Sequence, residues 1–136
     1  MLLAVNVVVA MLAGAPPAPP APPQFGFSVA AMGDNMVLQQ APAQASLWGF
    51  APSADAVSVS VIDNGGRPVS STIATLASFN ATAHVWRVLL PAVVASAVGS
   101  GVSYQITAAQ GAATTSIHDV LFGETWVCSG RAELLD

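Results

Sequence analysis

A regular alternation of apolar and polar residues in Val57-Ser58-Val59-Ser60-Val61 constrains the fold of this chain most. A period of two residues places all three valines on one face of a β-strand. The residues that follow, Asp63-Asn64-Gly65-Gly66, contain an Asn-Gly pair, which favours a tight hairpin turn with positive φ at both central residues. Val69 to Leu76 is rich in β-branched residues and predicts the returning strand.

The same kind of pattern recurs along the chain. Phe25 to Phe27, Val85 to Leu89 and Val102 to Ala108 are further short candidate strands, separated by turn residues that include proline and glycine. Val93 to Val98 allows a helical turn, but its valines disfavour a long helix. Several short strands with turn residues between them predict a mainly β protein, in which residues 25–120 form an antiparallel β-sandwich domain.

The charge of the chain excludes two classes of partner. The chain has no lysine, its three cations are Arg67, Arg87 and Arg131, and seven acidic residues give a net charge of −4. A nucleic-acid surface needs clustered cations that neutralise phosphates, and three scattered arginines cannot supply them. The same shortage of cations excludes binding to an anionic membrane surface.

Candidate metal ligands are few. His84, His118 and the single cysteine, Cys128, do not have the spacing of known metal sites, so we expect no metal and no cofactor. One cysteine cannot form an internal disulfide. Its neighbours Trp126 and Val127 favour a small buried apolar side chain rather than a reactive thiol.

The N-terminal residues predict a secretory leader. Met1 to Ala13 is an apolar run, interrupted only by Asn6, that is shorter than the roughly 20 residues needed to span a bilayer. Ala13-Gly14-Ala15 has the small-x-small pattern of a cleavage site, so we expect a signal peptide over residues 1–15 and no stable membrane span. An uncleaved anchor and a mis-assigned start are the alternatives.

Residues 16–24 continue a run of Ala-Pro-Pro repeats that begins at Ala15. Proline fixes φ and has no amide hydrogen, so this run predicts an extended polyproline II spacer, the alternative being a ligand for a proline-binding module. Asn80-Ala81-Thr82 is a sequon, which together with a leader makes Asn80 a candidate glycosylation site. These features predict a protein that is secreted or lumenal in the secretory pathway, which includes the lysosome.

Two blocks of sequence resemble a known family. Gly33 to Gly49 contains Asn35-Met36-Val37-Leu38-Gln39, followed by Ala-Pro-Ala and a Trp-Gly pair. His118 to Gly130 reads His-Asp-Val-Leu-Phe-Gly-Glu-Thr-Trp-Val-Cys-Ser-Gly. Both blocks, in this order, resemble the sialate O-acetylesterases, a branch of the SGNH-type ester hydrolases. The resemblance covers residues 25–130 and matches the N-terminal portion of such an enzyme only.

The resemblance implies a β-rich N-terminal domain ahead of an α/β catalytic domain. Residues 121–136 would then be the truncated start of the catalytic domain, with Thr125 to Cys128 as its first parallel strand. The partner strands of that sheet would lie outside the chain, so we expect Val120 to Val127 to be an unpaired, aggregation-prone strand.

The resemblance also locates the position of the nucleophile. The family continues from Cys-Ser-Gly with Gln-Ser-Asn, whose serine attacks the ester, whereas Gly130 is followed here by Arg131-Ala132-Glu133. Ala132 therefore occupies the nucleophile position, and the family's equivalent of Ser129 is not its nucleophile. We predict no catalytic residue in this chain.

His118 and His84 are the only candidate general bases. In SGNH hydrolases an aspartate usually stands three residues before the catalytic histidine, but Thr115 and Ala81 occupy those positions here. The resemblance favours a structural hydrogen bond for His118. Trp48, Trp86 and Trp126 could stack on a sugar ring, but tryptophans in strands usually pack in the core.

Two functions of different classes therefore remain. The first is an incomplete carboxylic ester hydrolase, whose complete relatives act on O-acetylated sialic acid or another acetylated glycan. The second is a secreted, non-catalytic β-domain that binds glycan or protein.

Overall fold

The computed structural model describes residue 14, residues 16–18 and residues 24–126. This part of the chain contains nine strands and no helix, and hence no helix long and apolar enough to cross a membrane. The strands are β1 (Gly26–Phe27), β2 (Val37–Gln39), β3 (Ser46–Ala51), β4 (Ser58–Asp63), β5 (Pro68–Ile73), β6 (Thr75–Ser78), β7 (His84–Leu89), β8 (Tyr104–Gln110) and β9 (Ala113–Gly123).

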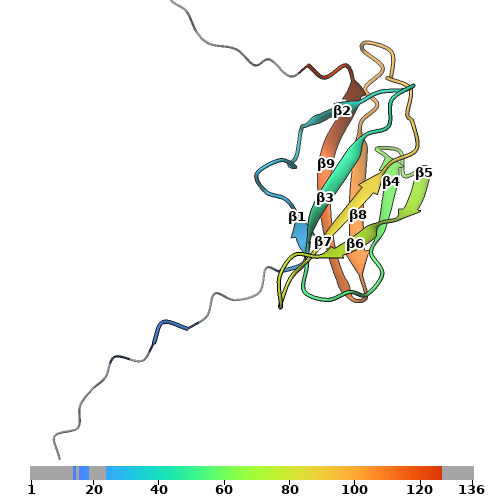
Figure 1. The fold of residues 1–136 in the computed structure, drawn as a ribbon. Coiled ribbons are helices and arrows are strands. Elements are labelled where there is room, and N and C mark those ends of the chain that lie inside the picture. The colour runs from blue at the N-terminus through green and yellow to red at the C-terminus, as the bar shows by residue number, and fades with distance from the viewer. Residues whose placement is uncertain (1–13, 15, 19–23, 127–136) are drawn as a thin grey trace, which may run out of the picture.

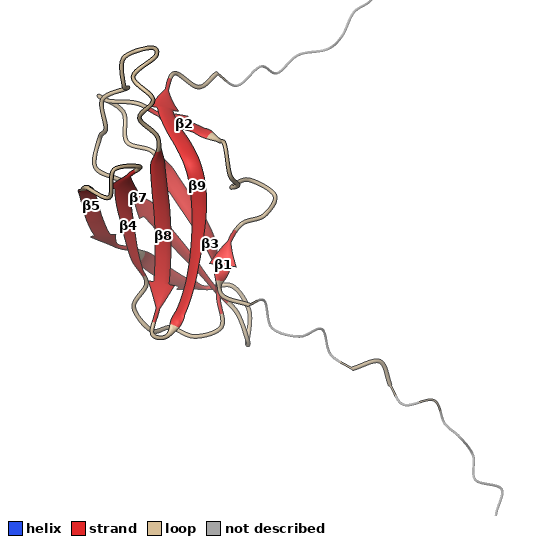
Figure 2. Cartoon of the chain, turned by 180° about the vertical axis from the view of Figure 1, so that it is seen from behind, coloured by secondary structure: helices blue, strands red, loops and turns tan. Residues whose placement is uncertain are grey.

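The strands form two sheets that pack face to face (Figures 1 and 2). One sheet has the order β1-β3-β7-β6, and the other has the order β2-β9-β8-β4-β5. All pairs are antiparallel except β2 with β9, which is parallel. The structure confirms the predicted mainly β fold and its sandwich of sheets.

The core lies between the sheets and follows the alternation in the sequence. Val57, Val59 and Val61 are completely buried, as their period of two predicts. Trp86 and Leu47 face them from the four-stranded sheet and are also completely buried. Val93, in the segment whose sequence allows a helical turn, is buried in a loop that contains no helix.

The turn between β4 and β5 differs from the predicted type. Among its residues only Gly66 has positive φ, at 82°, so the prediction of positive φ at both Asn64 and Gly65 is wrong. Asp63 explains the difference, because its Oδ1 accepts hydrogen bonds of 2.9 Å from the amides of Gly65 and Arg67. This longer loop uses a glycine in the left-handed region at its third residue, an arrangement common in three-residue hairpins.

The predicted returning strand, Val69 to Leu76, divides between the two sheets. Residues before Ala74 belong to β5 and pair with β4, whereas residues after it belong to β6 and pair with β7. Ala74 is buried at the crossing, and its amide donates to the carbonyl of Val57 at 2.9 Å. Local sequence cannot show such a crossing, since β-branched residues favour a strand in either sheet.

β9 passes the predicted domain boundary at residue 120 and ends at Gly123. Val120 pairs with Tyr104 of β8, and Leu121 to Gly123 pair with β2. The expectation that Val120 onward lacks partner strands is therefore wrong as far as Gly123. The prediction failed because β2 has only three residues, too few to show a period.

The predicted catalytic-domain strand Thr125 to Cys128 falls partly outside the described residues. Thr125 and Trp126 follow the end of β9 and lie in no strand. The signal peptide predicted over residues 1–15 and the spacer over 16–24 lie mostly outside the described residues and stay predictions.

Gly49 provides the space for the largest buried side chain. It pairs with Trp86 across β3 and β7, and a Cβ at Gly49 would lie 2.7 Å from the indole ring. Such a Cβ would also collide with the carbonyl oxygen of Gly26 on β1. Phe27 of β1 packs edge-on against Trp86, with ring centroids 5.2 Å apart. Glycine at this position therefore lets β1 and the indole approach β3 together.

The Gly49→Ala substitution should lower the free energy of unfolding by about 2 kcal/mol, because the methyl group overpacks a filled site. Gly33→Ala is the matched control, since a Cβ added at Gly33 would have no neighbouring atom within 4 Å. Urea denaturation followed by tryptophan fluorescence measures both variants. Equal stability of the two variants would contradict the packing role of Gly49.

Candidate functional site

The parallel pairing of β2 with β9 brings the two family-like sequence blocks together. Val37 pairs with Leu121, Leu38 with Phe122, and Gln39 with Gly123. The two blocks are therefore in direct contact, although the paired residues lie 84 positions apart in the chain. We call this pairing and the residues at its two ends the β2–β9 seam.

Backbone hydrogen bonds extend the seam beyond the paired residues. The Leu121 amide donates to the Met36 carbonyl at 3.0 Å, and the Gln40 amide donates to the Gly123 carbonyl at 2.8 Å. Leu38 and Phe122 are both buried in the core, so the seam is also held by apolar packing. The end of β9 is thereby fixed to the sandwich.

Gln39 holds the chain where it leaves β9. Its side-chain Oε1 accepts a hydrogen bond of 2.7 Å from the Thr125 hydroxyl and one of 3.2 Å from the Thr125 amide. Both contacts lie at the exposed end of the seam. One glutamine of the first block thus holds Thr125 of the second block.

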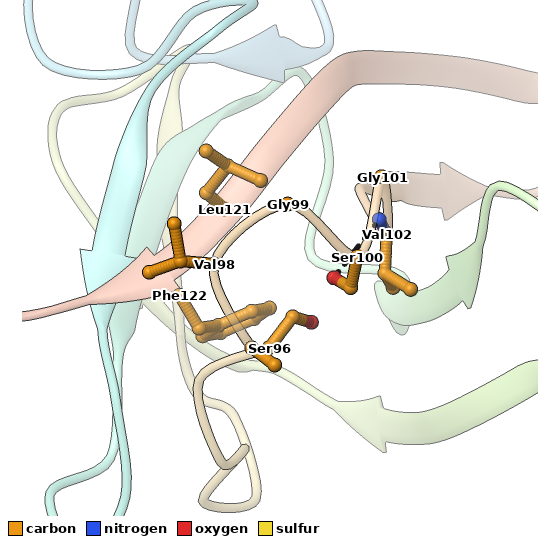
Figure 3. Close-up of a pocket in the computed structure, with 9 residues that line it drawn as sticks. Ser96, Val98, Gly99, Ser100, Gly101, Val102, Leu121 and Phe122 are labelled. Atoms are coloured by element: carbon orange, nitrogen blue, oxygen red, sulfur yellow. Dashed lines mark hydrogen bonds between the residues drawn. The ribbon is translucent and has the colours of Figure 1, made fainter.

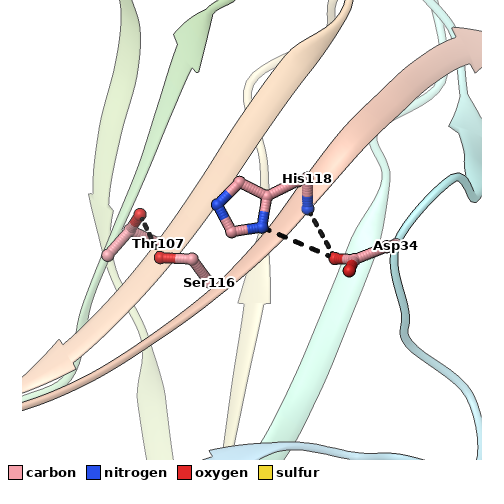
Figure 4. A network of polar contacts seen from close by, with 4 residues as sticks. All are labelled: Asp34, Thr107, Ser116 and His118. Carbon is pink, nitrogen blue, oxygen red and sulfur yellow. Dashed lines mark hydrogen bonds and ion pairs between the residues drawn. The ribbon is translucent and has the colours of Figure 1, made fainter.

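Asp34 makes the corresponding contact at the other end of the seam (Figure 4). Its Oδ1 accepts a hydrogen bond of 2.8 Å from the His118 amide, and the Asn35 amide donates to the His118 carbonyl at 3.0 Å. Asn35 and Asp119 both have positive φ, at 62° and 54°. Asn and Asp adopt this conformation more readily than most residues. Each block therefore carries a residue that suits the positive φ beside the Asp34–His118 contact.

The His118 side chain has a weaker contact with Asp34 than its backbone has. Nδ1 lies 3.6 Å from Asp34 Oδ1, and the two side chains are 53% and 59% exposed. A nearby hydroxyl pair, Thr107 and Ser116, is joined by a hydrogen bond of 2.8 Å (Figure 4). Among the described residues no serine hydroxyl donates a hydrogen bond to a histidine.

His84 lies elsewhere, on β7, with Nδ1 buried and no hydrogen-bond partner among the described residues. It pairs across strands with Ala51 and Ser78, and neither carries a carboxylate. Of the two histidines, only His118 has a carboxylate beside its ring, that of Asp34 at 3.6 Å.

Two hollows lie near the seam. The larger, of about 470 Å³, lies between the loop Ser96 to Val102 and the β9 residues Leu121 and Phe122 (Figure 3). Its lining is apolar except for backbone groups and serine hydroxyls. The smaller, of about 340 Å³, has Asp63, His118 and Asp119 in its wall. Within the described residues, no three His, Cys, Asp or Glu side chains gather as metal ligands.

Other residues singled out in the sequence lie apart from the seam. Asn80 is exposed in the turn between β6 and β7. Trp126 is 82% exposed and therefore does not pack in the core. Cys128, Ser129 and Ala132 lie outside the described residues.

Sequence reasoning missed the hydrogen bonds by which Asp34 and Gln39 join the first block to His118 and Thr125 of the second. All of these residues belong to the two blocks that carry the family resemblance. That resemblance was the available signal, but it gave no reason to expect contact between the blocks.

Comparison with known proteins finds relatives of one family. No family model matches the chain. Over 114 residues it is 31% identical to a sialate O-acetylesterase of Rattus norvegicus and 32% identical to one of Homo sapiens. These matches cover 80% of this chain but only 19% and 20% of the relatives, so the chain spans about a fifth of their length. The chain belongs to the sialate O-acetylesterase family, as the counterpart of one segment of those proteins.

Proposed function

We propose that this chain is the N-terminal, β-sandwich part of a sialate O-acetylesterase-like carboxylic ester hydrolase. The observation that carries the proposal is the β2–β9 seam, where the two family-like blocks are joined in space. In the complete enzyme the substrate would be O-acetylated sialic acid or another acetylated glycan, as the name of the relatives indicates.

The sandwich would serve as an anchor for the segment that approaches the nucleophile loop. Catalysis by a nucleophile needs the attacking atom held close to attack geometry, and small misplacements cost large factors in rate. Gln39 fixes Thr125 by two hydrogen bonds, and β2 fixes Leu121 to Gly123. A loop that begins a few residues later starts from a defined position.

We infer that the chain by itself does not hydrolyse esters. Ala132 has no hydroxyl with which to attack a carbonyl, and the sequence contains no aspartate three residues before a histidine. A serine without a base and an oxyanion hole loses several orders of magnitude in rate.

We also infer passage through the secretory pathway, with Asn80 as an acceptor of N-linked glycan. Asn80 is exposed, and its Oδ1 accepts hydrogen bonds from the Thr82 amide and hydroxyl, at 2.9 and 3.2 Å. The sequon therefore lies on an accessible turn, which a glycosylating enzyme requires.

The anchoring role can be tested in a chimera. Residues 25–126 of this chain would replace the matched segment of the human sialate O-acetylesterase, which keeps its own nucleophile loop. We expect the chimera to release acetate from O-acetylated sialic acid. Gln39→Ala in the chimera should lower kcat roughly tenfold, because it frees Thr125. Gln40→Ala is the matched control, since Gln40 contributes its backbone amide to the seam. A folded but inactive chimera, or equal effects of the two substitutions, would contradict the proposal.

The isolated chain should give no turnover of 4-nitrophenyl acetate or O-acetylated sialic acid above the rate of buffer. The triple substitution Arg131→Gln, Ala132→Ser and Glu133→Asn should stay inactive, because a restored serine still lacks its base. Both proteins are assayed beside a Ser129→Ala variant. Turnover that Ser129→Ala abolishes, or activity gained by the triple variant, would show that more of a catalytic site is present.

Expression in a secretory eukaryotic host tests the predicted processing. The secreted protein should begin near Ala15 when its N-terminus is sequenced. Treatment with an N-glycosidase should increase its gel mobility, and Asn80→Gln should abolish that shift. Soluble cytosolic protein that keeps Met1 would refute the leader, and an unchanged shift in Asn80→Gln would refute the glycan site.

A further inference from the structure

The outer face of the four-stranded sheet carries a row of aromatic side chains beside an arginine. Trp48 and Phe50 of β3 point away from the core, because their neighbours Leu47, Gly49 and Ala51 are buried. This sheet lies in front of β8 and β9 in Figure 1. We call Trp48, Phe50, Phe79 and Arg87 the outer aromatic face.

The three aromatic rings form a continuous row. The ring centroids of Trp48 and Phe50 are 5.7 Å apart at 73°, and those of Phe50 and Phe79 are 5.7 Å apart at 71°. Phe79 directly follows β6 and is 64% exposed, and exposed apolar patches often mark interaction sites. Edge-to-face pairs hold the rings in place, so the row needs little ordering before it binds a ligand.

Arg87 lies directly beside this row. It pairs with Trp48 on one side and with Thr75 on the other, and all three side chains share the outer surface of the sheet. The Arg87 side chain is exposed, and among the described residues no carboxylate forms an ion pair with it. Paired residues in neighbouring strands have Cβ atoms about 5 Å apart, so the guanidinium and the indole can contact one small ligand.

We propose that the outer aromatic face binds a sugar ring that carries a carboxylate, as found at the end of an acidic glycan. The C–H face of a sugar ring can pack on an aromatic face, whose π electrons attract its partly positive hydrogens. The guanidinium fork matches a carboxylate by two parallel hydrogen bonds. The hydroxyl of Thr75 lies on the same surface, although it also donates to the Arg87 carbonyl at 3.2 Å.

Charge complementarity favours this ligand over larger partners. This face has a single arginine, which suits a single anionic group. The net charge of −4 on the whole chain repels polyanions. A stable protein partner needs roughly 800 Å² of surface on each side, more than a short row of three rings offers. The site is open, so we expect a dissociation constant on the order of 1 mM. The proposal stands independently of ester hydrolysis, because it concerns binding on the sandwich alone.

The test is a titration of the full chain, labelled with ¹⁵N, followed by NMR. The probe is 3′-sialyllactose, and the controls are lactose, which lacks the carboxylate, and sodium acetate, which lacks the ring. We expect saturable shifts of β3 and β7 amides with sialyllactose, and shifts at least fivefold smaller with either control at equal concentration. Equal shifts with lactose or acetate, or shifts confined to other strands, would overturn the proposal.

Matched variants separate the two contacts. Arg87→Gln should weaken binding about tenfold, as expected for loss of a charge-assisted pair. Arg67→Gln, which removes the same charge on the β4–β5 turn, should leave it unchanged. Trp48→Ala should abolish binding and Trp48→Phe should retain most of it, whereas Trp126→Ala, at an exposed tryptophan outside this face, should have no effect.

The amide spectrum of each variant shows whether it is folded, and Arg87→Gln keeps the test decisive if Trp48→Ala unfolds. Equal weakening by Arg87→Gln and Arg67→Gln would reduce the effect to net charge and overturn the proposal. Sedimentation of the chain without ligand tests whether a second copy of the chain, instead of a sugar, occupies this face. A dimer that Phe79→Ala disrupts, without sugar binding, would assign the face to a second copy of the chain.

Discussion

The burial of one face of each sheet against the other is the constraint on which this structure depends. The valines of β4, Ile106 of β8 and Val120 of β9 form one side of the core, and Leu47, Trp86 and Val88 form the other. Apolar area removed from water contributes roughly 25 cal/mol per Å², and in a small domain nearly all of it comes from such a layer. Trp86 fills this layer only because Gly49 leaves space for its ring.

The β2–β9 seam depends on this core. Leu38 and Phe122 pack within it, so the last strand cannot detach from β2 without exposing both side chains. The polar contacts of Asp34 and Gln39 lie at exposed ends of the seam, where each hydrogen bond competes with water and contributes little to stability. These contacts set the position of the chain rather than its stability, because they hold the backbone amides of His118 and Thr125.

The outer face of the four-stranded sheet is positioned by the packing beneath it. On β7, alternate side chains reach the core and the solvent, so the same strand contributes Trp86 to the interior and Arg87 to the exterior. The pairing of β3 with β7 therefore sets the distance between Arg87 and Trp48, and the position of the outer aromatic row follows from the packing beneath it. The interior and the proposed ligand-binding face are two consequences of one alternation.

The sequence by itself determined the fold class, the buried face of β4 and the family. Each of these follows from residues that are close in the chain: an alternation of period two, turn residues, and blocks of matching sequence. Only the tertiary structure decided the division of Val69 to Leu76 between two sheets, the type of the Asp63 turn and the partner of Leu121 to Gly123. The same holds for the contacts of Asp34 with His118 and of Gln39 with Thr125. The physical reason is that a strand's period reports which side chains are buried, whereas its partner is chosen by packing between segments that are far apart in the chain.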